Sequence, residues 1–144
     1  MQAEAPSLTS EVLLLAESTV EANLVRLALD DRILNVVPAC PDVLSFLRRQ
    51  DPYSKSIKPD LILLDLDISN PEDCKVLEEI KQDPDFRRIP IVVLASSDGY
   101  EGVMKAYDLH ANAYVVKPKN EEDFIRVIRA TLNFWLTLAR LPRE

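Results

Sequence analysis

The sequence contains very little glycine, cysteine and histidine, and each shortage excludes a class of site. Its two glycines, Gly99 and Gly102, cannot form the glycine-rich loops that hold phosphate in dinucleotide-binding proteins and P-loop NTPases. One histidine and two cysteines, Cys40 and Cys74, cannot supply an HExxH pair or the four ligands of a structural zinc site. Two cysteines also provide no disulfide framework, which favours a reducing, cytoplasmic compartment.

The sequence also lacks a long apolar run and an excess of positive charge. No apolar stretch approaches the roughly 18 residues of a membrane span, and the first basic residue is Arg26, so no charged start precedes an apolar signal segment. The formal net charge is −7, which argues against binding to a phosphate backbone. With 144 residues, 47% of them hydrophobic, the chain suits one domain with a real core. We therefore expect an acidic domain that binds neither nucleic acid nor membrane.

Five short apolar runs alternate with longer stretches of helical spacing. The runs cover residues 12–16, 33–37, 61–65, 91–95 and 113–117. Three of them (VLLLA, LILLD and IVVLA) show no polar–apolar alternation, which is typical of strands buried on both faces of a parallel sheet. Buried helix segments would give the same pattern, but the shortness of the runs and the prolines Pro59 and Pro90 favour strands. We predict a flexible segment over residues 1–10 and, over residues 11–144, a doubly wound α/β domain with helices on both faces of a five-stranded parallel sheet.

Polar side chains follow several of these predicted strands. The carboxyl ends of parallel strands meet at one edge of a sheet, where ligands bind. That edge would hold Glu17, Asp65, Asp67 and Lys117 together, with Ser96 after the fourth strand. Carboxylates of this kind suit Mg²⁺, and a carboxylate beside Mg²⁺ and a lysine could accept a phosphoryl group.

Four stretches together resemble the receiver domains of two-component response regulators, over roughly residues 11–139. They are the acid Glu17, the run KPDLILLD that ends at Asp65, the run RIPIVVL, and the run ANAYVVKP that contains Lys117 and Pro118. The resemblance implies a flavodoxin-like sheet with strand order 2-1-3-4-5. It also implies a phosphoacceptor rather than an enzyme: Asp65 takes the phosphoryl group from a sensor histidine kinase, Lys117 offsets its charge, and Pro118 is a cis-proline.

The resemblance also implies a metal site and a switch, and the sequence departs from the family at both. Glu17, Asp65 and the backbone carbonyl of Asp67 are the implied ligands of Mg²⁺, but one of the two paired acids is replaced by Ala16, so we expect weak binding, which the negative charge of the Asp67 side chain would offset in part. The hydroxyl that normally ends the fourth strand is lost at Ala95. The switch residues that remain are Ser96, which can help only if the chain has already turned into a loop, and the aromatic Tyr114 on the fifth strand.

These departures leave a second interpretation open. A pseudo-receiver would keep the fold, ignore phosphate and act as a protein-binding module. A flavin carrier or a small phosphatase on the same fold is disfavoured by the scarcity of glycine and by the receiver motifs.

Two further departures from the family pattern, Ser69 and Asp73, change the loop after Asp65.

The sequence also resembles one subgroup of this family, the single-domain response regulators that partner cyanobacterial phytochromes. The stretches LDI, EIKQDPDFRRIP, LHAN and NFWL carry this resemblance, which implies a phytochrome-type kinase and an output through protein–protein interaction. Between Asn120 and Leu141 the apolar side chains span roughly 220° of a helical wheel, wider than the stripe of about 100° that covers one core. We therefore expect a homodimer through an extended C-terminal helix, with Phe134, Trp135 and Leu138 at the interface. The alternative is that residues 134–141 fold back over their own domain.

Overall fold

The computed structural model describes residues 9–139 as one α/β unit. Its strands are β1 (Glu11–Leu15), β2 (Ile33–Val37), β3 (Leu61–Asp65), β4 (Ile91–Ala95) and β5 (Ala113–Val116). Its helices are α1 (Thr19–Leu27), α2 (Cys40–Leu47), α3 (Pro71–Gln82), α4 (Tyr100–Asp108), α5 (Glu121–Asn133) and the short π-helix η2 (Phe134–Leu138). None of the helices in this range is long and apolar enough to cross a membrane.

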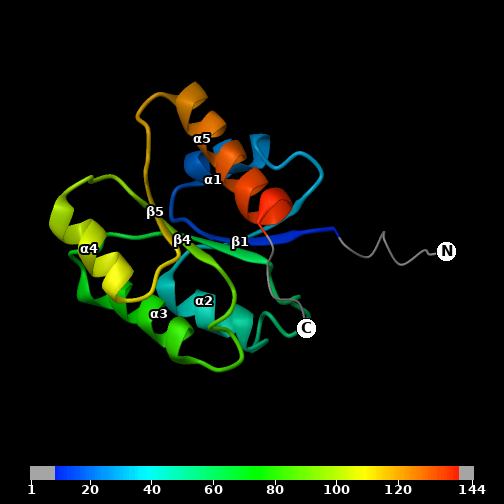
Figure 1. The fold of residues 1–144 in the computed structure, drawn as a ribbon. Coiled ribbons are helices and arrows are strands. Elements are labelled where there is room, and N and C mark those ends of the chain that lie inside the picture. The colour runs from blue at the N-terminus through cyan, green and yellow to red at the C-terminus, as the bar shows by residue number, and fades with distance from the viewer. Residues whose placement is uncertain (1–8, 140–144) are drawn as a thin grey trace.

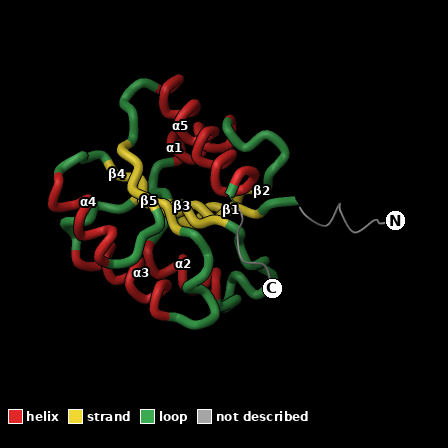
Figure 2. The backbone as a smooth tube through the Cα atoms, viewed as in Figure 1, coloured by secondary structure: helices red, strands yellow, loops and turns green. Residues whose placement is uncertain are grey.

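The strands form one sheet in the order β2-β1-β3-β4-β5, and every neighbouring pair is parallel. Parallel neighbours need a crossover connection, and each crossover here contains a helix. Figure 1 shows α1 and α5 over one face of the sheet and α2, α3 and α4 on the other side. Figure 2 shows the strands as the middle layer. The predicted fold class and strand order are confirmed.

Alternate residues of each strand enter two separate cores, which explains the unbroken apolar runs. On β3, Ile62 and Leu64 pack with α2 and α3, while Leu61 and Leu63 pack with α1 and α5. All four side chains are fully buried. Burying a side chain of this size contributes about 1.5–3 kcal/mol. Because both faces of the sheet are covered, polar groups of the central strands reach solvent only at the strand ends.

Polar side chains cap three helices at the carboxyl edge of the sheet. They are Ser18 before α1, Asn70 before α3 and Asn120 before α5, and each side-chain oxygen accepts a backbone N–H from the first helical turn, at 3.2, 2.9 and 3.0 Å. A cap of this kind stabilises a helix by about 1 kcal/mol. The caps hold the first turns of these helices beside the strand ends, so side chains of the first turn can reach this edge.

The sequence predicted one extended α-helix at the C-terminal end, but the structure divides it into two helical segments. After α5 the chain continues as η2, and the Ala139 N–H donates to the Phe134 carbonyl at 2.7 Å, which is the wider i→i−5 spacing. One guanidinium nitrogen of Arg32 donates to Asn133 Oδ1 at 2.9 Å and to Thr137 Oγ1 at 3.0 Å. This contact from the β2 side joins the two helical segments, so the helix geometry here depends on tertiary structure. Residues 1–8 and 140–144, with Leu141 and most of the predicted N-terminal segment, lie outside the described residues.

Lys81, near the end of α3, holds the loop that leads to β4, and its removal should weaken the fold. Its Nζ donates to the carbonyls of Arg87 at 3.1 Å and Ile89 at 2.9 Å, and burial lowers its pKa to about 8. We expect Lys81→Met to lower the free energy of unfolding by about 1–3 kcal/mol, because two carbonyls lose a charged donor. Urea unfolding measures the change. Lys75→Met, at an exposed position of the same helix, is the control and should change stability little; equal effects of the two variants would contradict the assignment.

Candidate functional site

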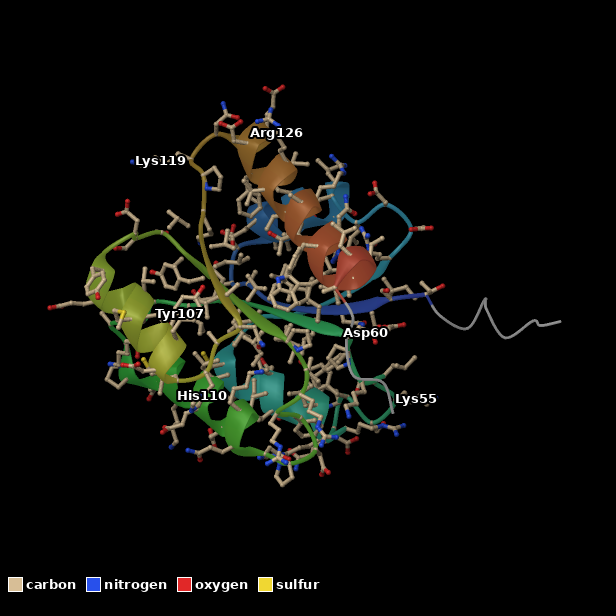
Figure 3. The ribbon with its side chains drawn as sticks, viewed as in Figure 1. Lys55, Asp60, Tyr107, His110, Lys119 and Arg126 are labelled. Carbon is tan, nitrogen blue, oxygen red and sulfur yellow. The ribbon has the colours of Figure 1, made fainter. Side chains whose placement is uncertain are left out.

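The carboxyl ends of β1, β3 and β5 open into a cavity of about 450 Å³ that is rich in acidic side chains. Five of its lining residues are acids: Glu17, Glu21, Asp65, Asp67 and Asp73. Lys117 is the cation that lines it with them. In Figure 3, Lys119 marks this end of the sheet, after β5, and Asp60 marks the opposite end, before β3. The predicted clustering of charged side chains at one sheet edge is therefore found in the structure.

Asp65 and Lys117 come into direct contact in this cavity. Asp65 is the last residue of β3, and its Oδ1 lies 2.9 Å from Nζ of Lys117. The backbone of Lys117 is held by its N–H, which donates to the Ala95 carbonyl at 2.7 Å. Both side chains are largely shielded from solvent, so their attraction is stronger than that of an exposed pair. The contact places an ammonium group on one oxygen of a strand-end carboxylate.

Glu21 is the member of this group that the sequence analysis missed. It lies in the first turn of α1, and its Oε2 accepts a hydrogen bond from Nζ of Lys117 at 3.1 Å. Burial, followed by the closeness of the Asp65 carboxylate, raises the pKa of Glu21 to about 7, and Lys117 opposes this rise. Burial alone would lower the pKa of Lys117, but its hydrogen bonds to Asp65 and Glu21 outweigh burial and raise it.

A sequence signal for Glu21 did exist. Ser18 and Glu21 form the Ser-x-x-Glu pattern of a capping box, and Ser18 Oγ does accept the Glu21 N–H. That pattern places Glu21 in the first turn of a helix that starts at the carboxyl edge of the sheet. In a capping box the glutamate would turn back to the start of its own helix, whereas here its Oε2 is bonded to Lys117.

The three predicted metal ligands line one cavity but do not converge. Glu17 is exposed, and the Asp67 carboxylate is occupied by Ser69, which donates to Oδ1 from its N–H at 3.0 Å and from its hydroxyl at 2.6 Å. The hydroxyl and N–H of Ser69 lower the pKa of Asp67. Within residues 9–139 no three His, Cys, Asp or Glu side chains are placed to hold a metal ion. Even so, the donors are the hard oxygens that Mg²⁺ or Mn²⁺ prefers, and Oε1 of Glu21 is buried without a hydrogen-bond partner, so the residues suit a divalent cation.

The loop after Asp65 is held by the two residues that depart from the family pattern. Ser69 binds the Asp67 side chain, and Asp73 Oδ2 accepts the backbone N–H of Asp67 at 2.7 Å. The Asp67 carbonyl in turn accepts the N–H of Asn70 at 2.9 Å. These hydrogen bonds give the loop a defined shape.

The predicted switch residues lie around a second cavity of about 750 Å³ beside Asp65. Ala95 ends β4 and is buried, so its methyl group stands where the family has a hydroxyl. Ser96 is exposed and belongs to the loop after β4, and it lines the same cavity as Asp65. The hydroxyl of Tyr114 donates to the Ser97 carbonyl at 2.6 Å, and burial raises the pKa of Tyr114. Ser96 therefore lies beyond the end of β4, in the loop that follows it.

The predicted cis-proline is wrong. Among the described residues the only cis peptide bond is Asp51–Pro52, so the Lys117–Pro118 bond is trans. The trans isomer of an X–Pro bond is the lower in free energy by about 0.5–1 kcal/mol, and the contacts of Lys117 with Ala95, Asp65 and Glu21 are all made with the trans bond.

The predicted interface residues on η2 divide into two kinds. Phe134 and Leu138 are exposed, at 50% and 73% of their surface. Trp135 packs against the core between the sheet and helices α1 and α5, and its ring meets the Phe134 ring edge to face at 5.2 Å between centroids. Part of η2 therefore covers its own domain, and part of it offers apolar surface to solvent.

Comparison with known proteins gives a consistent result. The sequence matches the response regulator receiver domain over residues 12–129. It is 36% identical over 135 residues to the response regulator Rcp1 of Synechocystis sp.. This alignment covers 91% of this chain and 92% of Rcp1. The structure resembles the phosphorylated cyanobacterial phytochrome response regulator RcpA with a TM-score of 0.87 at 32% identity, over 94% of this chain and 99% of that one. It resembles the Mn²⁺-bound form of Rcp1 with a TM-score of 0.84 at 36% identity, over 93% and 99% of the two chains.

The acidic cavity should make the Cys40 thiol unreactive. Cys40 Sγ donates to Asp73 Oδ1 at 3.4 Å, and burial, followed by this carboxylate, raises the pKa of the thiol to about 12. Because the thiolate is the nucleophile, we expect iodoacetamide at pH 8 to modify Cys40 far more slowly than a free thiol. Asp73→Asn should speed the reaction by lowering the pKa, whereas Glu78→Gln, on the exposed side of α3, should not. Peptide mapping by mass spectrometry measures the rate; rapid alkylation of Cys40 in the wild type would contradict this picture.

Proposed function

This chain belongs to the response regulator receiver domain family, which acts in two-component signalling, and on that premise we propose that Asp65 accepts a phosphoryl group from a sensor histidine kinase. The observation that carries the proposal is the 2.9 Å contact between Asp65 and Lys117 at the end of a buried strand. Since the solved structure of RcpA, described as a cyanobacterial phytochrome response regulator, matches almost the full chain, we propose a phytochrome-type kinase as the donor. We place the exchange in the cytoplasm, because both cysteines are free thiols.

In the proposed reaction a carboxylate oxygen of Asp65 attacks the phosphorus of a phosphohistidine on the kinase. The new O–P bond forms as the N–P bond breaks, and the histidine leaves with the electron pair of that bond. Lys117 offsets the negative charge that arrives on the phosphoryl oxygens. Glu17, Asp65 and the Asp67 carbonyl are the groups that would hold Mg²⁺, which supplies further charge compensation when it is bound.

A pseudo-receiver is the second candidate, and specific residues favour it. Ala16 and Ala95 remove one acid and one hydroxyl from the site, and the side chains of the described residues do not converge on a metal position. A protein of this kind would keep the fold and bind its partner without phosphate. The two candidates differ in whether Asp65 forms an acyl phosphate, so one chemical measurement separates them.

Incubation with Mg²⁺ and acetyl phosphate should add one phosphoryl group to the protein. We expect the adduct to be absent in Asp65→Asn, which has no carboxylate to attack phosphorus, and strongly reduced in Lys117→Met, which loses the charge that stabilises the transferred group. Intact-mass spectrometry measures the adduct. Asp60→Asn, at the opposite edge of the sheet, is the control for loss of a carboxylate. A wild type that forms no adduct and binds no Mg²⁺ would favour the pseudo-receiver.

We also propose that the protein signals as a homodimer that uses the exposed apolar side chains of η2. Sedimentation over a dilution series should show a dimer for the wild type. We expect Phe134→Ser and Leu138→Ser to shift the equilibrium to monomer, since each exposes less apolar surface that a partner could cover. Met104→Ser, on the exposed side of α4, should leave the dimer intact. A monomer at every concentration would end this proposal, and loss of the dimer in Met104→Ser alone would move the interface to α4.

A further inference from the structure

We propose that Glu21 is a positioning residue that competes with the phosphoryl group on Asp65 for the ammonium group of Lys117. This inference rests on the proposed function, because it concerns the phosphorylated state of Asp65. Nζ of Lys117 lies 2.9 Å from Asp65 Oδ1 and 3.1 Å from Glu21 Oε2. One cation is thus shared between a carboxylate that reacts and a carboxylate that does not.

Glu21 depends on this cation. Its side chain is only 17% exposed, and its Oε1 is buried without a hydrogen-bond partner among the described residues. A buried carboxylate that loses its cationic partner is destabilised, because nothing replaces the solvation it gave up on folding. Any movement of Lys117 away from Glu21 therefore raises the free energy of the protein.

Phosphorylation favours such a movement. The phosphoryl group brings more negative charge to Asp65 than the carboxylate had, and it places this charge beyond the end of the side chain. Lys117 is then drawn from the carboxylate toward the phosphoryl oxygens. Glu21 cannot follow freely, because the Ser18 cap holds its backbone N–H at 3.2 Å and so fixes the start of α1.

Glu21 consequently weakens the hold of the site on an anion at Asp65 in two ways. Its own negative charge repels the incoming group. Its hydrogen bond to Lys117 also competes with the phosphoryl oxygens for the ammonium group. In the resting state the same arrangement is favourable, since Lys117 neutralises two neighbouring carboxylates at once. Glu21 therefore biases the protein toward the unphosphorylated state.

Equilibrium binding of beryllofluoride, an anion that attaches to aspartate as a phosphoryl mimic, tests this bias. The titrations are run at pH 8 and at Mg²⁺ concentrations that saturate each variant, so that altered metal affinity does not interfere. Amide signals in ¹H–¹⁵N NMR spectra report occupancy. We expect Glu21→Gln to bind beryllofluoride about tenfold more tightly than the wild type, because the competing charge is gone while the shape is kept.

Three further variants make the result specific. Glu21→Asp retains the charge and should bind within about twofold of the wild type, a rescue that a purely structural role would not predict. Glu78→Gln removes an exposed carboxylate from α3 and should also match the wild type. Thermal unfolding shows whether Glu21→Gln is folded, and if it is not, Glu21→Ala takes its place with the same expectation.

Equal or weaker binding by a folded Glu21→Gln would overturn the inference and leave the proposed function intact. A wild type that neither binds beryllofluoride nor forms the acetyl phosphate adduct would overturn the proposed function, and this inference with it. Tighter binding by Glu21→Gln, with the aspartate variant and the α3 control unchanged, would support the competition.

Discussion

The site depends on one ammonium group that lies between two carboxylates where the buried sheet ends. Without Lys117, Asp65 and Glu21 would repel each other across a short distance, and the closeness of Asp65 already helps to raise the pKa of Glu21. Above pH 7, where Glu21 loses its proton, the three charges sum to −1 with Lys117 in place, so the edge still attracts a cation. The arrangement therefore keeps the Asp65 carboxylate beside positive charge, and it leaves at this edge hard oxygen donors of the kind that a divalent ion prefers.

The rest of the fold makes this arrangement possible. Both faces of the sheet are covered by helices, and the core positions of β3 are fully shielded from water. The two cores stabilise the strands independently of the charges at their ends, so the domain tolerates repulsion among carboxylates at a functional edge. The strand ends and the capped helix starts then hold Asp65, Lys117 and Glu21 on three different elements, β3, the end of β5 and α1. No single segment of the chain could bring these groups together.

The features that could be predicted from sequence are those that local pattern determines. Five short apolar runs predicted the five strands, and three of the runs are unbroken because a strand covered on both faces has no polar side to alternate with. Asp65 and Lys117 were predictable because strand ends share one edge of a parallel sheet. The partner of Lys117 was not, since the reach of Glu21 depends on a side-chain orientation that a capping pattern leaves open. The π-helix could not be predicted from local sequence either, because the contacts from Arg32 to Asn133 and Thr137 join residues about a hundred positions apart. The trans bond at Pro118 was not predicted because the family associates this motif with a cis bond.

The loop after β3 explains why the loss of the acid at position 16 is not simply offset by a new acid at position 67. The Asp67 side chain was expected to add a compensating negative charge, yet its carboxylate is bound by Ser69, and the Asp67 N–H is bound by Asp73. Glu21, by contrast, has a buried oxygen with no partner and lies in contact with the cation that Asp65 uses. A largely buried carboxylate on α1 is thus bound to Lys117. Because Glu21 and Asp65 share one ammonium group, the electrostatics of this edge depend on a residue of α1 as well as on the strand ends.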